Sequence, residues 1–321
     1  MGKVLVTGAA GFIGSQVTEY LLARGDTVIG IDNLDPVYDP QLKLRHIELL
    51  RQHSGFEFIP ADIRNIAEIE SIFKVHKFCS VVHLAAKAGV RPSFLDPAAY
   101  IDTNVKGTSN LLQLSANSTV EHFVFASSSS VYGDRVGRPF AESDFTDRPV
   151  SPYAATKKMG EEFCYIYHHR SGIPVSCLRF FTAYGPRQRP DLAIHKFAHL
   201  LSRNLPIPVF GDGNTSRDYT YVGDIVNGVT LALDKPAQFE IYNIGSGRPV
   251  KLSCMIDILG EVMKKVPKVE YYPQQDGDVT ATFADISKSK RMFNYQPTIA
   301  FEDGIERFIE WFLQQNAVGA K

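Results

Sequence analysis

The 321-residue sequence contains few cysteines and no long apolar run. Its four cysteines are scattered and lack the close spacing of metal ligands or of a redox pair, so we expect no metal site. Cys79 and Cys177 lie in apolar, strand-like runs and are predicted to be reduced core residues of a cytoplasmic protein. Because no apolar run reaches the roughly 18 residues that span a membrane, we expect no membrane partner. The first strand-like run begins at Lys3, which leaves no room for a signal peptide.

The sequence also lacks an excess of either charge. Its 34 basic and 35 acidic residues give a formal net charge of -1, so we expect no nucleic-acid partner. A hydrophobic content of 44% is ordinary for a globular protein that buries a core. The length indicates two domains or one large α/β domain. Local basic clusters such as Arg187 with Arg189 could still bind a phosphate or a carboxylate.

Strand-like and helix-like patterns alternate over the first 180 residues. This alternation predicts an α/β fold with a Rossmann-type, doubly wound parallel sheet. Beyond Pro186 the pattern becomes mixed, and we expect residues 217–233 and 240–243 to return to the main sheet. The predicted organisation has two interleaved domains: a cofactor-binding domain of residues 1–181 and 219–250, and a smaller α/β substrate-binding domain of residues 182–218 and 251–321. The expected strands cover residues 3–7, 27–31, 56–60, 80–85, 122–126 and 173–180, and the expected helices cover residues 15–24, 41–52, 66–75, 97–116 and 152–170.

Three glycines follow the first predicted strand. Gly8, Gly11 and Gly14 lead into a helix, and the next strand ends on Asp32. Glycines let the backbone approach a pyrophosphate at the helix N-terminus, and an acidic residue at this distance can bind the ribose 2′-hydroxyl. Since that carboxylate would repel a 2′-phosphate, the pattern predicts NAD rather than NADP. The glycines are spaced three and three, unlike the common two and three, so a tight turn alone is the alternative.

Small residues at the end of the predicted strand 80–85 suit a close approach of the backbone to the cofactor. We assign two groups of residues to the cofactor site, one beside the glycine motif and one after this strand. The group near the glycines comprises Phe12, Ile13 and Asn33, and the group after the strand comprises Leu84, Ala85, Ala86 and Lys87.

A second motif opens the helix after Ser151-Pro152. Tyr153 and Lys157 are four residues apart, so their side chains project from one face of that helix. A phenol has a pKa of about 10 and is a poor base at neutral pH. A nearby ammonium lowers that pKa, which would make Tyr153 an acid/base for interconverting a hydroxyl and a ketone. Such pairs also occur in helices for structural reasons alone.

Four serines, residues 127–130, follow the predicted strand 122–126. Ligands of open parallel sheets lie at the carboxyl ends of the strands, so these hydroxyls are candidates for a substrate contact. We expect Ser128 to bind the substrate oxygen whose proton Tyr153 exchanges, and Ser127 and Ser129 could share the task. A flexible linker is the alternative reading of a serine run.

Together these residues resemble the extended short-chain dehydrogenase/reductases. The resemblance rests on the glycine motif that begins at Thr7, on Ser128, Tyr153 and Lys157, and on the segment His83–Ala86. Within that group the chain looks most like the nucleotide-sugar epimerases, and among these the UDP-glucuronate 4-epimerases. The narrower resemblance is carried by residues 88–91, 184–191 and 217–222.

The resemblance implies NAD-dependent epimerisation of a UDP-sugar at C4 through a transient 4-keto intermediate, most simply of UDP-glucuronate to UDP-galacturonate. It also implies a homodimer through helices 97–116 and 152–170. Asp62 and Ile63 would lie beside the adenine, although Asp62 could instead cap the following helix. Asn104 would organise its helix near the active site, although an Asn within a helix is usually solvated.

The substrate residues are implied in the same way. Arg91 would belong to the substrate site, Arg217 would meet the diphosphate, and Asp278 would lie near the uridine ribose. Val209 and Phe210 would line the uracil pocket. Thr182 and Arg189 would bind the carboxylate of a glucuronate, because a guanidinium presents a planar fork that matches a carboxylate. The alternatives are that Arg217 and Asp278 are ordinary surface ions and that Arg189 holds its own loop.

Three other functions stay open at this point. A UDP-glucose/galactose 4-epimerase would share every catalytic residue, and a UDP-glucuronate decarboxylase would share the oxidation step. An NAD-sensing binding protein on a borrowed fold is the alternative without catalysis. The presence of Ser128, Tyr153 and Lys157 argues against a sensor, which needs none of them.

Overall fold

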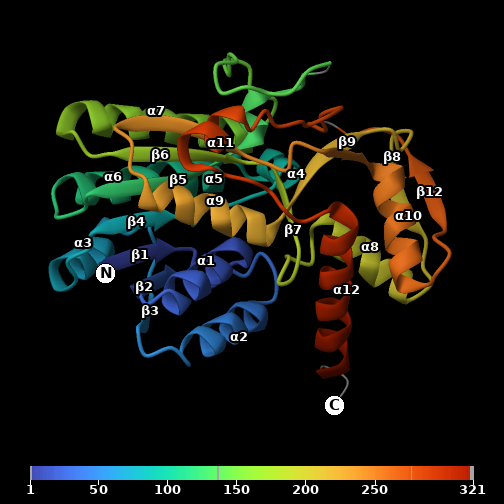
Figure 1. Ribbon diagram of the computed structural model, residues 1–321, viewed down its shortest axis with the longest axis horizontal. Helices are drawn as coiled ribbons and strands as arrows, with labels where there is room; N and C mark the ends of the chain where they lie inside the picture. The colour runs from blue at the N-terminus through green and yellow to red at the C-terminus, as the bar shows by residue number, and fades with distance from the viewer. Residues whose placement is uncertain (1, 136, 276, 319–321) are drawn as a thin grey trace.

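The computed structural model describes residues 2–135, 137–275 and 277–318. Its centre is a seven-stranded sheet of order β10-β6-β5-β4-β1-β2-β3, in which all neighbouring strands are parallel (Figure 1). The predicted α/β fold with a parallel, Rossmann-like sheet is therefore confirmed. The strands are β1 (Lys3–Thr7), β2 (Thr27–Asp32), β3 (Phe56–Pro60), β4 (Ser80–His83), β5 (His122–Ser128), β6 (Val175–Phe180) and β10 (Phe239–Ile244).

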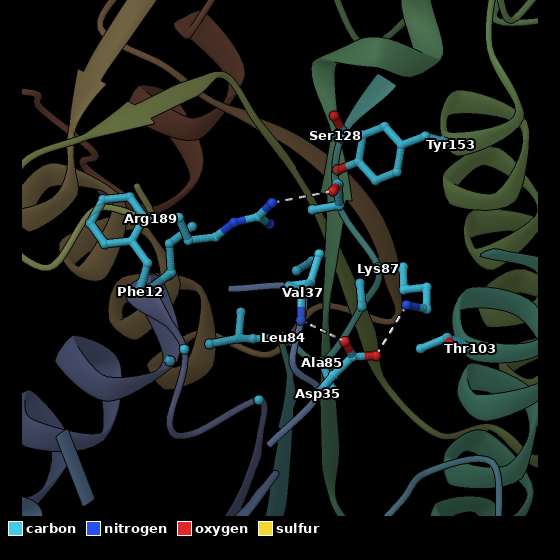
Figure 2. Close-up of a pocket in the computed structure, with 18 of the residues that line it drawn as sticks. Phe12, Asp35, Val37, Leu84, Ala85, Lys87, Thr103, Ser128, Tyr153 and Arg189 are labelled. Atoms are coloured by element: carbon cyan, nitrogen blue, oxygen red, sulfur yellow. Dashed lines mark hydrogen bonds and ion pairs between the residues drawn. The ribbon is translucent and has the colours of Figure 1, made fainter. Parts of the chain in front are cut away.

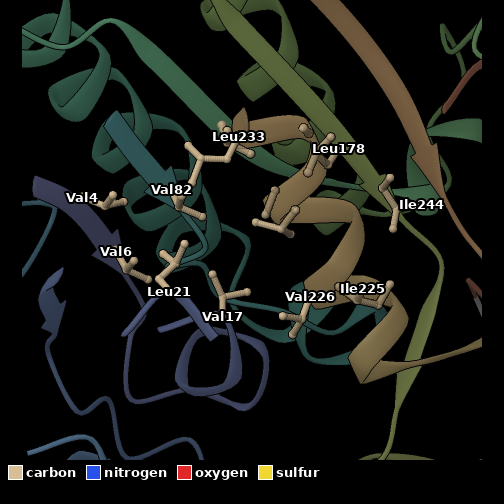
Figure 3. Close-up of a cluster of buried hydrophobic side chains, with 14 of the residues drawn as sticks. Val4, Val6, Val17, Leu21, Val82, Leu178, Ile225, Val226, Leu233 and Ile244 are labelled. Carbon is tan, nitrogen blue, oxygen red and sulfur yellow. The ribbon is translucent and has the colours of Figure 1, made fainter. Parts of the chain in front are cut away.

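Helices cover both faces of this sheet because successive strand residues point to opposite faces. From β1, Val4 and Val6 pack with α1 and α9, whereas Leu5 packs on the other face. Figure 3 shows the first of these two cores, with Val17 of α1 and Val226 of α9 facing the strands. One face carries α1 (Phe12–Ala23), α2 (Pro40–Leu50) and α9 (Val222–Asp234), and the other carries α3 (Ile66–Val75), α6 (Gly107–Ala116) and α7 (Pro152–Ser171).

A second, smaller region lies beyond one end of the sheet strands (Figure 1). It has its own hydrophobic core, which includes Tyr184, Val209 and Phe308. Its strands form a three-stranded sheet of order β11-β9-β7 and a two-stranded sheet of β12 with β8. These elements are β7 (Thr182–Tyr184), β8 (Ile207–Phe210), β9 (Ser216–Tyr221), β11 (Pro249–Lys251), β12 (Val269–Tyr272), α8 (Ala193–Ser202), α10 (Leu252–Met263) and α12 (Phe301–Val318), while α11 (Ser287–Phe293) packs on β10.

The predicted return of the chain to the main sheet is correct only in part. Helix α9 packs on the main sheet and β10 extends it beside β6. The strand expected at residues 217–221 is β9, which pairs with β7 and β11 in the separate sheet, so that part of the prediction is wrong. The reason is that β7 leaves the main sheet directly after β6 and offers β9 a partner. The two-domain division remains a proposal, and residues 1, 136, 276 and 319–321 of its ranges lie outside the described residues.

The predicted helix 97–116 is interrupted. It consists of α5 (Pro97–Ile101), a π-helical segment (Asp102–Lys106) and α6, preceded by the short α4 (Val90–Leu95). A π-helical turn inserts a residue into a helix and often occurs at functional sites. Here it buries the side chain of Asn104, which is 2% exposed. The solvated alternative for Asn104 is therefore excluded.

The serine run is part of the folded core. Strand β5 continues through Ser127 and Ser128, and a 3-10 turn at Ser129–Tyr132 follows. The first three of these serines are buried, so the segment is no flexible linker. No helix in the described part of the chain is both long and apolar enough to cross a membrane.

Candidate active site

The glycine motif forms a close-packed cradle at the start of α1. Gly8 has a φ of +70°, and a Cβ there would lie 2.8 Å from the backbone nitrogen of Ala85. A Cβ at Gly14 would lie 2.0 Å from the carbonyl oxygen of Gly8. Gly11 caps α1 with extended backbone and no side-chain hydrogen bond. The free N–H groups of a helix N-terminus attract anions, so this cradle fits the pyrophosphate of a dinucleotide.

A cavity of about 590 Å³ opens beside this cradle, at the carboxyl ends of the parallel strands (Figure 2). It joins the glycine turn, the segment after β4, and the Ser–Tyr–Lys set in one space. Among the residues assigned from the sequence, its lining includes Gly8, Gly11, Phe12, Ile13, Gly14, Asp32, Asn33, Ile63, Leu84, Ala85, Ala86, Lys87, Ser127, Ser128, Tyr153, Lys157, Thr182 and Arg189. In the described part of the chain, no cluster of three His, Cys, Asp or Glu residues is arranged for a metal ion.

Asp32 lies at the end of β2 and is 7% exposed. Its Oδ1 accepts a hydrogen bond of 2.8 Å from the backbone N–H of Leu34 and an ion-pair contact of 3.4 Å from Lys43 Nζ. Lys43 lines the cavity but was not predicted from the sequence. Its signal was the amphipathic pattern of α2, whose buried face contains Lys43, His46, Ile47 and Leu50.

Residues 33–39 form a loop beside this end of the cavity. Asp35 accepts a hydrogen bond of 3.0 Å from Lys87 Nζ, which links the loop to the segment after β4 (Figure 2). Tyr38 also lines the cavity, and its ring lies 5.2 Å from Lys43 Nζ and 5.8 Å from Arg189 Cζ. Burial raises the pKa of Tyr38 well above its usual value. The sequence motifs gave no sign of these contacts, which depend on segments far apart in the chain.

Asp62 and Asn104 lie outside the cavity lining and position residues near it. Asn33 Nδ2 donates to Asp62 Oδ2 at 3.0 Å, and the Arg64 guanidinium lowers the Asp62 pKa far below its usual range. The cap of α3 is Asn65, so Asp62 is not a helix cap.

Asn104 accepts from the Lys87 backbone N–H at 2.8 Å and donates to the Lys87 carbonyl at 2.9 Å. Asn104 therefore fixes the backbone that lines the cofactor side.

Lys157 lines the cavity and is 4% exposed. Its Nζ donates to the carbonyl oxygen of Ala126 at 2.7 Å and lies 5.2 Å from the ring centroid of Phe125. Desolvation lowers the Lys157 pKa to about 8. The amine is thus held at one strand end and loses its charge more readily than an exposed lysine.

Tyr153 begins the first turn of α7, whose cap is Ser151. Burial raises the Tyr153 pKa, while the nearby Ser128 hydroxyl and the positive charge of Arg189 act to lower it. Arg189 is thus a cation near Tyr153 that the sequence motif did not predict. The expected action of Lys157 on the Tyr153 pKa stays a prediction. In the structure Ser128 Oγ donates to Ser130 Oγ at 3.1 Å.

The serines after β5 have different partners. Ser127 donates to Glu161 Oε1 at 2.6 Å, and Glu161 also makes two 2.8 Å hydrogen bonds with buried Arg179. The Ser127 proton is therefore committed to a buried ion pair. Ser129 is not part of the cavity lining. Ser128 faces Tyr153 across a short gap in Figure 2, which agrees with its choice as the substrate contact.

Arg189 approaches the same point from the substrate side. Its guanidinium points across the cavity toward Ser128 and Tyr153 (Figure 2). Nε and Nη2 donate to the two carboxylate oxygens of Asp191 at 2.9 and 2.6 Å. Thr182 lines the same cavity as Arg189. The cavity thus brings a phenol, a serine hydroxyl and a cation together at the place expected for a sugar.

A second hollow has a volume of about 480 Å³, and Arg91 is the one residue expected to bind the nucleotide that lines it. Arg91 forms a 2.6 Å ion pair with Asp278, and its Cζ lies 4.8 Å from the centroid of the Phe210 ring. Burial lowers the pKa of Arg217, while the charge of Asp278 acts to raise it. Val209 is 1% exposed, packs in the core of the smaller region and lines neither of these two cavities. Phe94, Gln274 and Gln275 complete the hollow and were not predicted.

Residues 5–308 match the family model described as GDP-mannose 4,6 dehydratase. A UDP-glucuronate 4-epimerase from Thermodesulfobacterium geofontis is 44% identical over 312 residues, which cover 97% of this chain and 96% of the relative. The solved UDP-glucuronic acid 4-epimerase of Bacillus cereus, in complex with UDP-glucuronic acid and NAD, superposes with a TM-score of 0.93 at 36% identity, covering 98% of this chain and 99% of that one.

A UDP-glucose 4-epimerase from Thermotoga maritima, solved with UDP-glucose, superposes with a TM-score of 0.90 at 32% identity, covering 98% of this chain and 99% of that one. The similarity to relatives of both kinds extends over nearly the whole chain, beyond the short motifs of the cavity. The chain therefore belongs to the GDP-mannose 4,6-dehydratase family of extended short-chain dehydrogenase/reductases.

Proposed function

We propose that this protein is an NAD-dependent UDP-glucuronate 4-epimerase, which interconverts UDP-glucuronate and UDP-galacturonate. The relatives support C4 epimerisation of a UDP-sugar with NAD as cofactor. The observation that carries the choice of glucuronate is the Arg189 guanidinium, which points at Ser128 and Tyr153 across the cavity. A cation at this position matches a sugar whose C6 is a carboxylate.

The cofactor side of the cavity fits NAD. The glycine cradle packs so closely that a Cβ at Gly8 or Gly14 would collide with the backbone, and this leaves the helix N-terminus open to a pyrophosphate. Asp32 lies at the end of β2, where such folds bind a ribose hydroxyl. Lys157 and the Leu84–Lys87 segment would complete the site. Bound NAD supplies the chemistry of accepting a hydride from sugar C4 and returning it to the opposite face.

Tyr153 exchanges the proton of the sugar O4. As a phenolate it removes that proton during oxidation, and as a phenol it returns it during reduction. Ser128 and Arg189 favour the phenolate against the cost of burial, since both lower the Tyr153 pKa. Ser128 also donates to O4 and so holds the hydroxyl in line with Tyr153. The overall change is inversion at C4 without net oxidation.

The oxidised sugar needs protection from a side reaction. A 4-keto uronate is a β-keto acid and loses carbon dioxide when its C5–C6 bond aligns with the carbonyl π system. Arg189 and Thr182 hold the carboxylate out of that alignment. Arg91, Arg217 and Asp278 keep the nucleotide in place, so the keto sugar can turn over while it stays bound.

We also propose that the enzyme is a cytoplasmic homodimer. All four cysteines are free, as expected of a reducing compartment. Apolar side chains are exposed along the helices expected at the dimer interface: Ile101, Met159 and Ile166 are 43 to 53% exposed. Such a patch favours burial against a second copy.

One assay separates the candidate activities. The purified protein is incubated separately with UDP-glucuronate, UDP-glucose and UDP-xylose. No NAD is added, and the products are identified by NMR. We expect UDP-galacturonate from UDP-glucuronate without carbon dioxide. Release of carbon dioxide would identify a decarboxylase, and turnover of UDP-glucose alone would identify a UDP-glucose 4-epimerase, the candidate favoured by the Thermotoga relative.

A further inference from the structure

The carboxylate of Asp191 occupies one edge of the Arg189 guanidinium. Nε donates to Oδ1 at 2.9 Å and Nη2 donates to Oδ2 at 2.6 Å. A guanidinium has five N–H donors in a rigid plane, and a carboxylate can bind it either at the Nε/Nη2 edge or at the Nη1/Nη2 edge. Asp191 takes the first edge. Among the described residues, Nη1 donates to no protein acceptor.

We propose that Asp191 is a specificity-determining residue that orients Arg189 toward the carboxylate of the sugar; this inference rests on the proposed function. Asp191 holds the Nε/Nη2 edge of a guanidinium that points across the cavity toward Ser128 and Tyr153 (Figure 2), and Nη1 has no protein acceptor among the described residues. A bidentate pair fixes the plane of the guanidinium as well as its position. Asp191 itself does not line the cavity, so it acts through Arg189.

Two further contacts restrict the same guanidinium. Nη2 lies 3.5 Å from the carbonyl oxygen of Ala88, and Cζ lies 5.8 Å from the centroid of the Tyr38 ring. The first is too long to be a strong hydrogen bond, and a ring face contacts a cation without fixing its rotation. The two short bonds to Asp191 are therefore the contacts that determine which edge of Arg189 faces the substrate.

The exposure of the two partners separates this role from a role in folding. The Arg189 side chain is 15% exposed, whereas the Asp191 side chain is 44% exposed at the rim. Surface substitutions change stability little, so removing the Asp191 carboxylate should leave the fold intact. Its loss would free a guanidinium that has several rotatable bonds. The cost should then fall on substrates that need this cation in one orientation.

The test compares Asp191→Ala and Asp191→Asn with the wild-type enzyme on two substrates. We expect Asp191→Ala to lower kcat/KM for UDP-glucuronate about tenfold or more and for UDP-glucose about twofold at most. Asp191→Asn keeps one acceptor oxygen and should fall between wild type and Asp191→Ala. The matched control is Asp257→Ala, an exposed aspartate of α10. Equal losses on both substrates would overturn the proposal.

A double-mutant cycle tests whether Asp191 acts through Arg189. If it does, Asp191→Ala should have little further effect once Arg189→Ala is present, because coupled residues are not additive. Additive effects of the two substitutions would contradict the proposal.

A binding measurement keeps this test separate from the proposed function. In a Tyr153→Phe background, calorimetry measures the affinity for UDP-glucuronate and UDP-glucose with and without Asp191→Ala. The proposal requires Asp191→Ala to weaken UDP-glucuronate selectively by about tenfold. An unchanged preference overturns it. This readout applies even if wild-type enzyme fails to turn over UDP-glucuronate, which would refute the proposed function alone.

Discussion

The two ends of the cavity are built in different ways. The cofactor end consists largely of backbone and small side chains in contact with one another, such as Gly8 against Ala85 and Gly14 against Gly8. The sugar and nucleotide end consists of long charged side chains that pair with one another, as in Arg91 with Asp278 and Arg189 with Asp191. The cofactor end therefore has a fixed shape. At the sugar and nucleotide end, the charged side chains can bind a ligand as well as each other.

This difference predicts how each end responds to substitution. At the cofactor end an added atom collides with backbone, which cannot move without shifting α1 or β4. At the other end a removed charge leaves its partner able to rotate or to bind water. Effects should therefore be all-or-none at the glycine cradle and graded at the arginines.

Gly14→Ala should give the largest effect. Its Cβ would lie 2.0 Å from the carbonyl oxygen of Gly8, so the cradle must open. We expect loss of bound NAD and of all measurable activity. The measurement is the cofactor content of the purified protein, with Asp257→Ala on the exposed face of α10 as a control. Full NAD content in Gly14→Ala would contradict a rigid cradle.

Tyr153→Phe should give the next largest effect while leaving both ends intact. It removes only the phenolic oxygen, and a positioned acid/base typically contributes about 10²- to 10⁴-fold in rate. We expect kcat to fall in that range, with NAD and UDP-glucuronate still bound. Steady-state kinetics and calorimetry check the two halves of this statement. Retained turnover would remove Tyr153 from the mechanism.

Arg91→Ala should give a graded effect on the nucleotide end. Because UDP is common to every substrate, KM should rise about tenfold for UDP-glucuronate and UDP-glucose alike, with kcat nearly unchanged. Arg148→Ala is the matched control, since the Arg148 side chain is 94% exposed. A rise in KM for UDP-glucuronate alone would place Arg91 at the sugar carboxylate. It would contradict the assignment of that carboxylate to Arg189.

The smallest effect concerns pH and the cofactor end. Burial lowers the pKa of His46 to about 4, and its Nδ1 contacts the carbonyl oxygen of Ala10 in the glycine turn at 2.9 Å. Since the unfolded histidine takes up a proton at about 6.5, the unfolded state binds more protons between pH 6.5 and 4. The stability that depends on neutral His46 is present above pH 6.5 and is lost as the pH falls through 4.

Melting temperatures measured from pH 7 to pH 4.5 check this sign. His46→Gln should show a shallower decline than the wild type, because glutamine does not titrate. Parallel declines in the two proteins would mean that His46 contributes no pH dependence.

The cofactor end was the more predictable part from sequence. The strand–glycine–helix unit, Asp32 and the Tyr153–Lys157 spacing are local patterns, and local chain geometry determines where they lie. Strand β3 and helix α3 have the predicted bounds for the same reason. The π-helical turn at Asn104 was missed because its sequence reads as ordinary helix.

The sugar end depends on contacts between distant segments. Arg91 meets Asp278 and Phe210 across segments far apart in the chain. Arg217 lies on β9, which pairs with β7 and β11 outside the main sheet, and the strand pattern did not reveal this. The partners Asp191 and Tyr38 also have no periodic signal, and the pattern of α2 places Lys43 on its buried face without showing that it pairs with Asp32. The resemblance to epimerases identified candidates there, but pairing and burial required the fold.

The most direct test of the account uses UDP-glucuronate that carries deuterium at C4. The purified enzyme, without added NAD, should convert it to UDP-galacturonate that retains the deuterium at C4, because the hydride leaves and returns within one cavity. It should release no carbon dioxide. Loss of the deuterium to solvent, or a product that keeps the original C4 configuration, would contradict epimerisation through a bound 4-keto sugar.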